Sequence, residues 1–108
     1  MFARHVSMRL RPESVTKFAI VIETEVIDLL RKQPGFIDQL TLMSPERAEA
    51  IFITFWQTKE SEEAFNRAQN PEVLEKLLGV IEGPPQINLF ELVNSPFYHR
   101  ADNSLKIT

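Results

Sequence analysis

The chain has 108 residues, no cysteine and a formal net charge of −3, with 44% hydrophobic and 25% charged residues. These values fit a single globular domain, and they exclude disulfides, a thiol nucleophile and a zinc–cysteine cluster. Basic residues are scattered, and no stretch approaches the roughly 18 consecutive apolar residues of a membrane helix. Arginines interrupt the N-terminal segment, unlike a signal peptide. We therefore expect a cytoplasmic protein with no nucleic-acid and no membrane partner.

The first quarter of the chain predicts a strand followed by a helix. Apolar residues alternate from Phe2 to Leu10, as in a half-buried strand. Pro12 and Ser14 predict a helix start, with the Ser14 hydroxyl accepting a bond from a free backbone N–H. The helix places one apolar face toward the core and ends before Pro34. That face comprises Val15, Phe18, Ala19, Ile22, Val26, Leu29 and Leu30.

The middle of the chain predicts a β-hairpin. A second strand is expected over Phe36–Met43, and residues 44–47 (Ser-Pro-Glu-Arg) form the turn. The return strand, Ala50–Trp56, is rich in β-branched and aromatic residues on both of its faces.

Two helical pieces and a last strand complete the pattern. Thr58 is expected to cap a short helix, and Asn70 begins a second piece that ends before Gly83. The first piece starts with Glu60, Glu62 and Glu63, which we interpret as a solvated helix start, with a metal–carboxylate site as a remote alternative. The last strand is expected over Gln86–Val93.

The order βαββαβ predicts an α+β, ferredoxin-like fold, a four-stranded antiparallel sheet with both helices on one face. The other face would be bare, although the third predicted strand is apolar on both sides. A second copy of the sheet would cover it, so we expect a homodimer through the sheet face. Residues 1–94 would form the domain, and residues 95–108 a C-terminal tail.

Three segments carry a resemblance to a known family: PGF after the first helix, FITFWQTKESEEAFNR, and VIEGPPQINLFELV. With them the chain resembles the antibiotic biosynthesis monooxygenase superfamily of dimeric α/β barrels over about residues 2–93. The resemblance implies oxygenation of aromatic molecules by molecular oxygen with no metal, flavin or other cofactor. It also implies an apolar pocket between sheet and helices, with Trp56 in or beside it. A lone tryptophan ending an apolar strand is also an ordinary core residue.

In this interpretation nine residues line the pocket of a small apolar or aromatic substrate. The apolar walls would be Met8, Phe18, Ile22, Phe52, Trp56, Phe65 and Phe90, with Thr54 or Asn88 as polar groups that orient the substrate. The sequence assigns no general base, so the catalytic residues stay unknown. The alternative function is a non-catalytic dimer that binds a small molecule or serves as a stress-related accessory protein.

Heme is not expected as a cofactor. The heme-degrading branch of the same superfamily uses a histidine on the second helix and an asparagine on the first strand, and this chain has neither. Its two histidines, His5 and His99, are interpreted as solvated or hydrogen-bonded rather than metal-binding. His5, Ser7 and Arg9 share one side of the first strand. They would either face a cavity as base, donor and cation, or form polar contacts in the dimer or with water.

A second apolar stripe on the first helix leads to an expectation about the tail. Ile20 and Ile27 are seven residues apart and lie off the predicted core face. Phe97 and Tyr98 are the nearest aromatic residues without an assigned place. We therefore expect residues 94–100 to pack on the protein surface or on a partner subunit.

Overall fold

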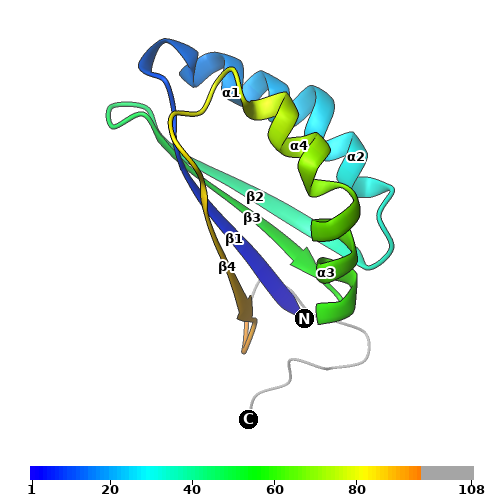
Figure 1. Cartoon of the computed structure of the whole chain (residues 1–108). Coiled ribbons are helices and arrows are strands. Elements are labelled where there is room, and N and C mark those ends of the chain that lie inside the picture. Colours follow the sequence, from blue (N-terminus) through cyan, green and yellow to red (C-terminus); the bar gives the residue numbers. More distant parts are fainter. Residues whose placement is uncertain (96–108) are drawn as a thin grey trace.

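The computed structural model describes residues 1–95 and has the predicted architecture. One antiparallel sheet has the order β2-β3-β1-β4. The strands are β1 (Phe2–Arg9), β2 (Phe36–Ser44), β3 (Glu49–Trp56) and β4 (Gln86–Glu91). The helices are α1 (Val15–Val21), α2 (Ile27–Arg31), α3 (Lys59–Ala68) and α4 (Asn70–Leu77). All four helices lie over one face of the sheet (Figure 1). This confirms the ferredoxin-like βαββαβ fold.

Alternation along β1 and β3 separates a helix-covered face from an open face. Phe52, Thr54 and Trp56 of β3 are buried, whereas the intervening residues are half-buried. The core extends from this face to the helices and includes Phe18, fully buried, and Leu30. Residues that follow one another in a strand point to opposite faces, so burial assigns each position to its side.

The β2–β3 hairpin is confirmed, with each strand one residue longer than predicted. Ser44 pairs with Glu49, and Phe36 pairs with Trp56 at the far end. The turn between them holds Ala48 at φ 52°, a left-handed conformation that non-glycine residues seldom adopt. A register shift between Phe36 and Asp38 marks a bulge in β2.

The first helical segment differs from the predicted single regular helix. It begins with a 3-10 turn, Pro12–Ser14, and α1 and α2 are separated by a π-helical turn, Ile22–Val26. Ser14 is buried and its side chain makes no capping bond, so the predicted cap is wrong. The Thr24 hydroxyl donates to the Ile20 carbonyl four residues earlier, a bond that competes with the regular helical pattern.

The π turn also alters which side chains face the core. A π turn closes with an i to i+5 bond, here from the Ile27 N–H to the Ile22 carbonyl, and so rotates the residues after it. Ile27 consequently packs against the core, while Ile20 stays 53% exposed. The predicted common stripe of these two isoleucines is therefore wrong. Ala19, predicted on the core face, is exposed, and Val21 is buried instead.

The Thr58 cap of α3 is confirmed, because its side chain accepts a bond of 3.0 Å from the Ser61 N–H. The expected solvated start of this helix is wrong at Glu62, which is 6% exposed. Along α4, Val73 and Leu77 are buried against the core.

The last strand is shorter than predicted and forms an edge of the sheet. β4 ends at Glu91, and Leu92 then donates a backbone bond to the Met1 carbonyl. On the helix side of β4, Ile87 remains 43% exposed. Residues 96–108 lie outside the described part of the chain, and with them most of the expected tail and its Phe97 and Tyr98.

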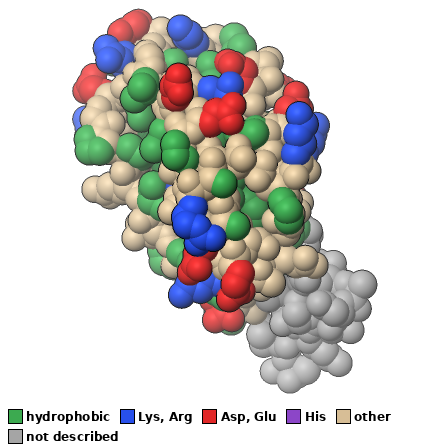
Figure 2. Space-filling model, turned by 45° about the vertical axis from the view of Figure 1, so that its right-hand side comes forward, with side chains coloured by type: hydrophobic (Ala, Val, Ile, Leu, Met, Phe, Trp, Pro, Cys, Tyr) green, Lys and Arg blue, Asp and Glu red, His purple; other side chains and the backbone are tan. Residues whose placement is uncertain are grey.

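Positive and negative side chains are interspersed over the face shown in Figure 2, with hydrophobic side chains between them. None of the helices within residues 1–95 is long and apolar enough to cross a membrane.

Candidate functional site

Trp56 ends β3 beneath the helices and is fully buried. Its ring centroid lies 5.0 Å from that of Phe65 on α3 and 5.6 Å from that of Phe36 on β2. The indole N–H donates to the Thr54 hydroxyl at 2.9 Å, so the polar atom of the ring is satisfied inside the core. Trp56 is therefore a fixed aromatic wall, with Thr54 beside it.

A charged pair lies against this aromatic wall. Arg4 on β1 pairs directly across the sheet with Thr54, and its guanidinium carbon is 5.6 Å from the Phe65 ring centroid. The Arg4 Nε lies 3.2 Å from the Glu62 Oε2, although this N–H is not aligned for a hydrogen bond. Arg4 Nη2 donates to the Asn66 Oδ1 at 3.1 Å. Strand β1 and helix α3 therefore meet at one polar cluster, which we define as Arg4, Glu62 and Asn66.

Burial determines the electrostatics of this cluster. The side chains of Arg4 and Glu62 are 4% and 8% exposed. Desolvation lowers the pKa of the Arg4 guanidinium, while the negative charge of Glu62 and the contact with it oppose that shift. Asn66 is exposed, so the cluster connects the buried aromatic wall to the surface. A carboxylate and a guanidinium in this setting can together accept a proton and hold an anion.

The structure brings together seven of the nine predicted pocket residues. All seven are buried on the helix side of the sheet: Met8, Phe18, Ile22, Phe52, Thr54, Trp56 and Phe65. Asn88 and Phe90 are not with them. They pair with His5 and Ala3 of β1, which belong to the open face, so the sheet itself separates them from Trp56. The reason is the alternation of β4, which the sequence pattern did not assign to a side.

The charged pair was missed by the sequence analysis, although signals for it exist. Arg4 occupies the same parity as Val6 and Met8, whose side chains face the core. Glu62 lies three residues before Phe65 and four before Asn66, which places all three on one side of α3. These spacings place Arg4 and Glu62 each on the inner side of its own element, but they do not specify that the two side chains meet.

The open face carries a different set of side chains. His5, Ser7 and Arg9 lie on it together, as their shared parity predicted. The His5 Nδ1 is buried and has no hydrogen-bond partner among residues 1–95, and its ring meets the Phe90 ring edge-on at 6.1 Å. His99 lies outside the described residues.

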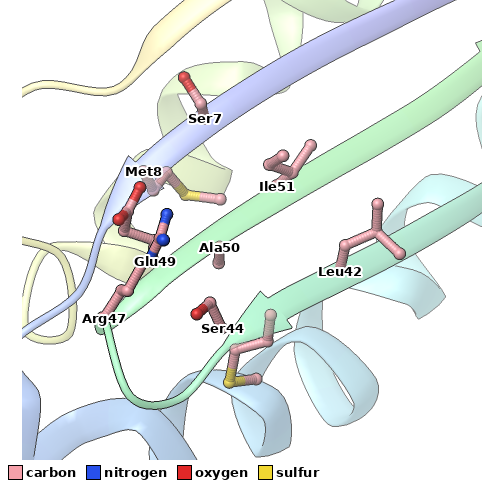
Figure 3. Close-up of a pocket in the computed structure, with 9 residues that line it drawn as sticks. Ser7, Met8, Leu42, Ser44, Arg47, Glu49, Ala50 and Ile51 are labelled. Carbon is pink, nitrogen blue, oxygen red and sulfur yellow. The ribbon is translucent and has the colours of Figure 1, made fainter.

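A shallow hollow of about 340 Å³ lies at the hairpin end of this open face. Ser7, Ile51 and Leu42 line it from three neighbouring strands, and Arg47 and Glu49 stand at its end (Figure 3). A second hollow of about 260 Å³ adjoins it and shares Ser7 and Glu49. Within residues 1–95, no group of three or more potential metal ligands comes together.

The structure is similar to several solved structures. A monooxygenase from Streptomyces coelicolor, solved in complex with the ligand nanaomycin D, superposes with a TM-score of 0.72 at 17% identity, over 87% of this chain and 88% of that one. An antibiotic biosynthesis monooxygenase superposes with a TM-score of 0.68 at 12% identity, over 86% of this chain and 99% of that one. The chain has the fold of the antibiotic biosynthesis monooxygenases.

This shared fold does not determine one activity. A Nitrosomonas europaea protein of unknown function superposes as well, with a TM-score of 0.74 at 17% identity, over 87% of this chain and 90% of that one. No family model matches the sequence, and no curated protein matches it. The function must therefore be argued from the site.

Proposed function

We propose that this protein oxygenates a small aromatic or apolar molecule with molecular oxygen and no cofactor. The observation that carries the proposal is the buried Arg4–Glu62 pair against the Trp56–Phe65 wall. A buried ion pair contributes little net stability, whereas charged groups buried against apolar side chains are typical of sites that move protons. The monooxygenases among the structural neighbours support the same reaction class.

The chemistry requires a substrate that can lose a proton to form a stabilised carbanion. An aromatic ketone with an activated CH₂ group satisfies this requirement. The carbanion reduces oxygen, one oxygen atom becomes the new carbonyl of a quinone, and the other leaves as water with the two hydrogens of the CH₂ group. All electrons come from the substrate, so no external reductant is needed. The residues have to bind the substrate, accept its proton and exclude water.

One observation favours the alternative of a small-molecule binder without catalysis. The Trp56 ring is fully buried and its N–H is already bonded to Thr54. The tryptophan therefore offers no free donor to a reacting atom. A binder would take up the aromatic molecule and return it unchanged, which distinguishes the two functions.

We further propose that the open sheet face forms a homodimer. Leu40, Leu42 and Phe90 are each about half exposed on this face, and Ile51 and Ile53 lie between them. An apolar surface across neighbouring strands is typical of an interface. A second sheet would cover it and leave the helix side free for the substrate.

The reaction can be tested with anthrone, an aromatic ketone with an acidic CH₂ group. The protein should consume oxygen and anthrone in equal amounts and form anthraquinone, faster than the spontaneous oxidation and undiminished by metal chelators. Trp56→Phe, which removes the bond to Thr54, should slow the reaction by about tenfold or more through misplacement of the wall. Leu78→Ala, on the exposed end of α4, is the matched control. Binding of anthrone without any rate above background would support the binder instead.

A further inference from the structure

We infer that Glu62 is the proton acceptor of this site and Arg4 its anion-binding group, so that the substrate is a neutral, weakly acidic phenol or enol. The assignment rests on the proposed function and gives residues to its proton-transfer step. It is drawn from the unusual way in which the Arg4 guanidinium is held.

The guanidinium is buried but only partly satisfied. Arginine carries five N–H donors. Within residues 1–95, Nη2 bonds to Asn66, whereas Nε is buried beside Glu62 and has no hydrogen-bond partner. Arg4 is 3% exposed, so this donor cannot be explained as an ordinary surface group. Nε is therefore the donor to which an oxygen atom of a ligand would bind.

The contact between Arg4 and Glu62 also differs in geometry from a strong structural ion pair. Arginine and carboxylate pair most strongly through two parallel hydrogen bonds. Here one carboxylate oxygen approaches Nε from 3.2 Å without hydrogen-bond alignment. A carboxylate held by charge, with its lone pairs not engaged by aligned N–H groups of Arg4, is free to accept a proton from a third group.

A route to the cluster exists on two sides. Asn66 is exposed at the surface of α3 and bonds directly to Arg4. On the other side, the register pairs Arg4 with Leu89 of β4, and Leu89 is only half-buried. Ile87, two residues away on the same face of β4, is 43% exposed, so this strip of the helix side is not fully covered.

The proton transfer conserves charge within the site. Before binding, the site contains a guanidinium and a carboxylate. The phenol O–H bond breaks, its proton passes to a Glu62 carboxylate oxygen, and the phenolate that forms pairs with Arg4. The site then contains a guanidinium, a phenolate and a neutral carboxylic acid, so its net charge is unchanged. A buried site favours such a transfer, because creating a new net charge there is costly.

The test uses para-nitrophenol, whose neutral and ionised forms absorb at different wavelengths. The chain has a single tryptophan, so quenching of Trp56 fluorescence reports binding at this site. Binding is measured about one pH unit below the solution pKa of the probe, where most of it is neutral. Its absorption spectrum is recorded at saturation, and calorimetry in two buffers of different ionisation enthalpy counts the protons released.

We expect wild-type protein to bind the probe in its ionised form and to release close to no protons. Glu62→Gln should still bind the ionised form at Arg4 but release about one proton per probe, because the acceptor is gone. Glu63→Gln, on the exposed side of the same helix turn, should behave as wild type.

The other outcomes overturn the assignment in distinguishable ways. Ionised probe with a full proton released by wild type would remove Glu62 as the acceptor. Bound but neutral probe would overturn both roles while leaving the proposed pocket and oxygenation intact. An absence of tryptophan quenching and of binding heat would contradict the pocket itself, and with it the proposed function. Because the wild-type spectrum alone decides the ionisation, the test does not depend on the folding of a variant.

Discussion

Removal of one partner of the Arg4–Glu62 pair should strongly destabilise the protein, whereas removal of both should not. Glu62→Leu leaves the Arg4 side chain, which is 4% exposed, without its counter-charge. Breaking a buried pair in this way costs about 3–5 kcal/mol. Since about 1 kcal/mol shifts the melting temperature of a domain near this size by roughly 4–8 °C, the variant should melt about 12 °C or more below wild type. Differential scanning calorimetry measures the shift.

The double variant Arg4→Met/Glu62→Leu completes the cycle. Apolar residues of similar volume relieve the desolvation of both charges, so the double variant should melt at or above the temperature of wild type. Glu63→Leu, at an exposed position one residue away, should change stability by no more than about 0.5 kcal/mol. A Glu62→Leu protein that melts within about 4 °C of wild type would refute the reasoning, because Glu62 would then be solvated.

Three further predictions concern assembly, local packing and cofactor. If the open face forms the proposed dimer interface, Leu42→Asp should produce a monomer in size-exclusion chromatography with light scattering. Leu78→Asp, at a more exposed position at the end of α4, should leave the dimer intact. A wild-type monomer at micromolar concentration would refute the interface. Gly35→Ala should lower the free energy of unfolding by about 1–3 kcal/mol in a denaturant titration, because Gly35 has φ 80° and a methyl group there would overlap Ser61. Gly79 has open space around it, so Gly79→Ala should not lower this free energy. Equal effects of the two substitutions would contradict the reasoning. Hemin should produce no saturable shift of its Soret band, and a titration to one site per chain would show that an axial ligand was overlooked.

Local sequence patterns were sufficient to predict the elements that are buried on one side only. The alternation of β1, the hairpin of β2 and β3 and the Thr58 cap each depend on neighbours within a few residues in the sequence. The order of elements then limits the topology to very few arrangements. For these reasons the fold and most of the Trp56 wall could be predicted.

Local sequence patterns did not predict which way side chains face after the π turn or on the edge strand β4. The π turn Ile22–Val26 rotates Ile27 toward the core, and no apolar spacing signals such an insertion. β4 has exposed residues on both faces, so its sequence does not show which side Asn88 and Phe90 take. Only the pairing with His5 and Ala3 places them opposite Trp56.

The sequence by itself determined the ferredoxin-like order of elements, the bare apolar sheet face and the aromatic residue at the end of β3, because each follows from short-range periodicity. Only the tertiary structure decided that Arg4 and Glu62, 58 positions apart, form a buried pair beside that residue. A charged residue is ordinarily assigned to solvent, and it becomes a core residue only when a partner on another element compensates its charge. Whether such a partner exists depends on how α3 docks on the sheet, which local sequence patterns do not specify.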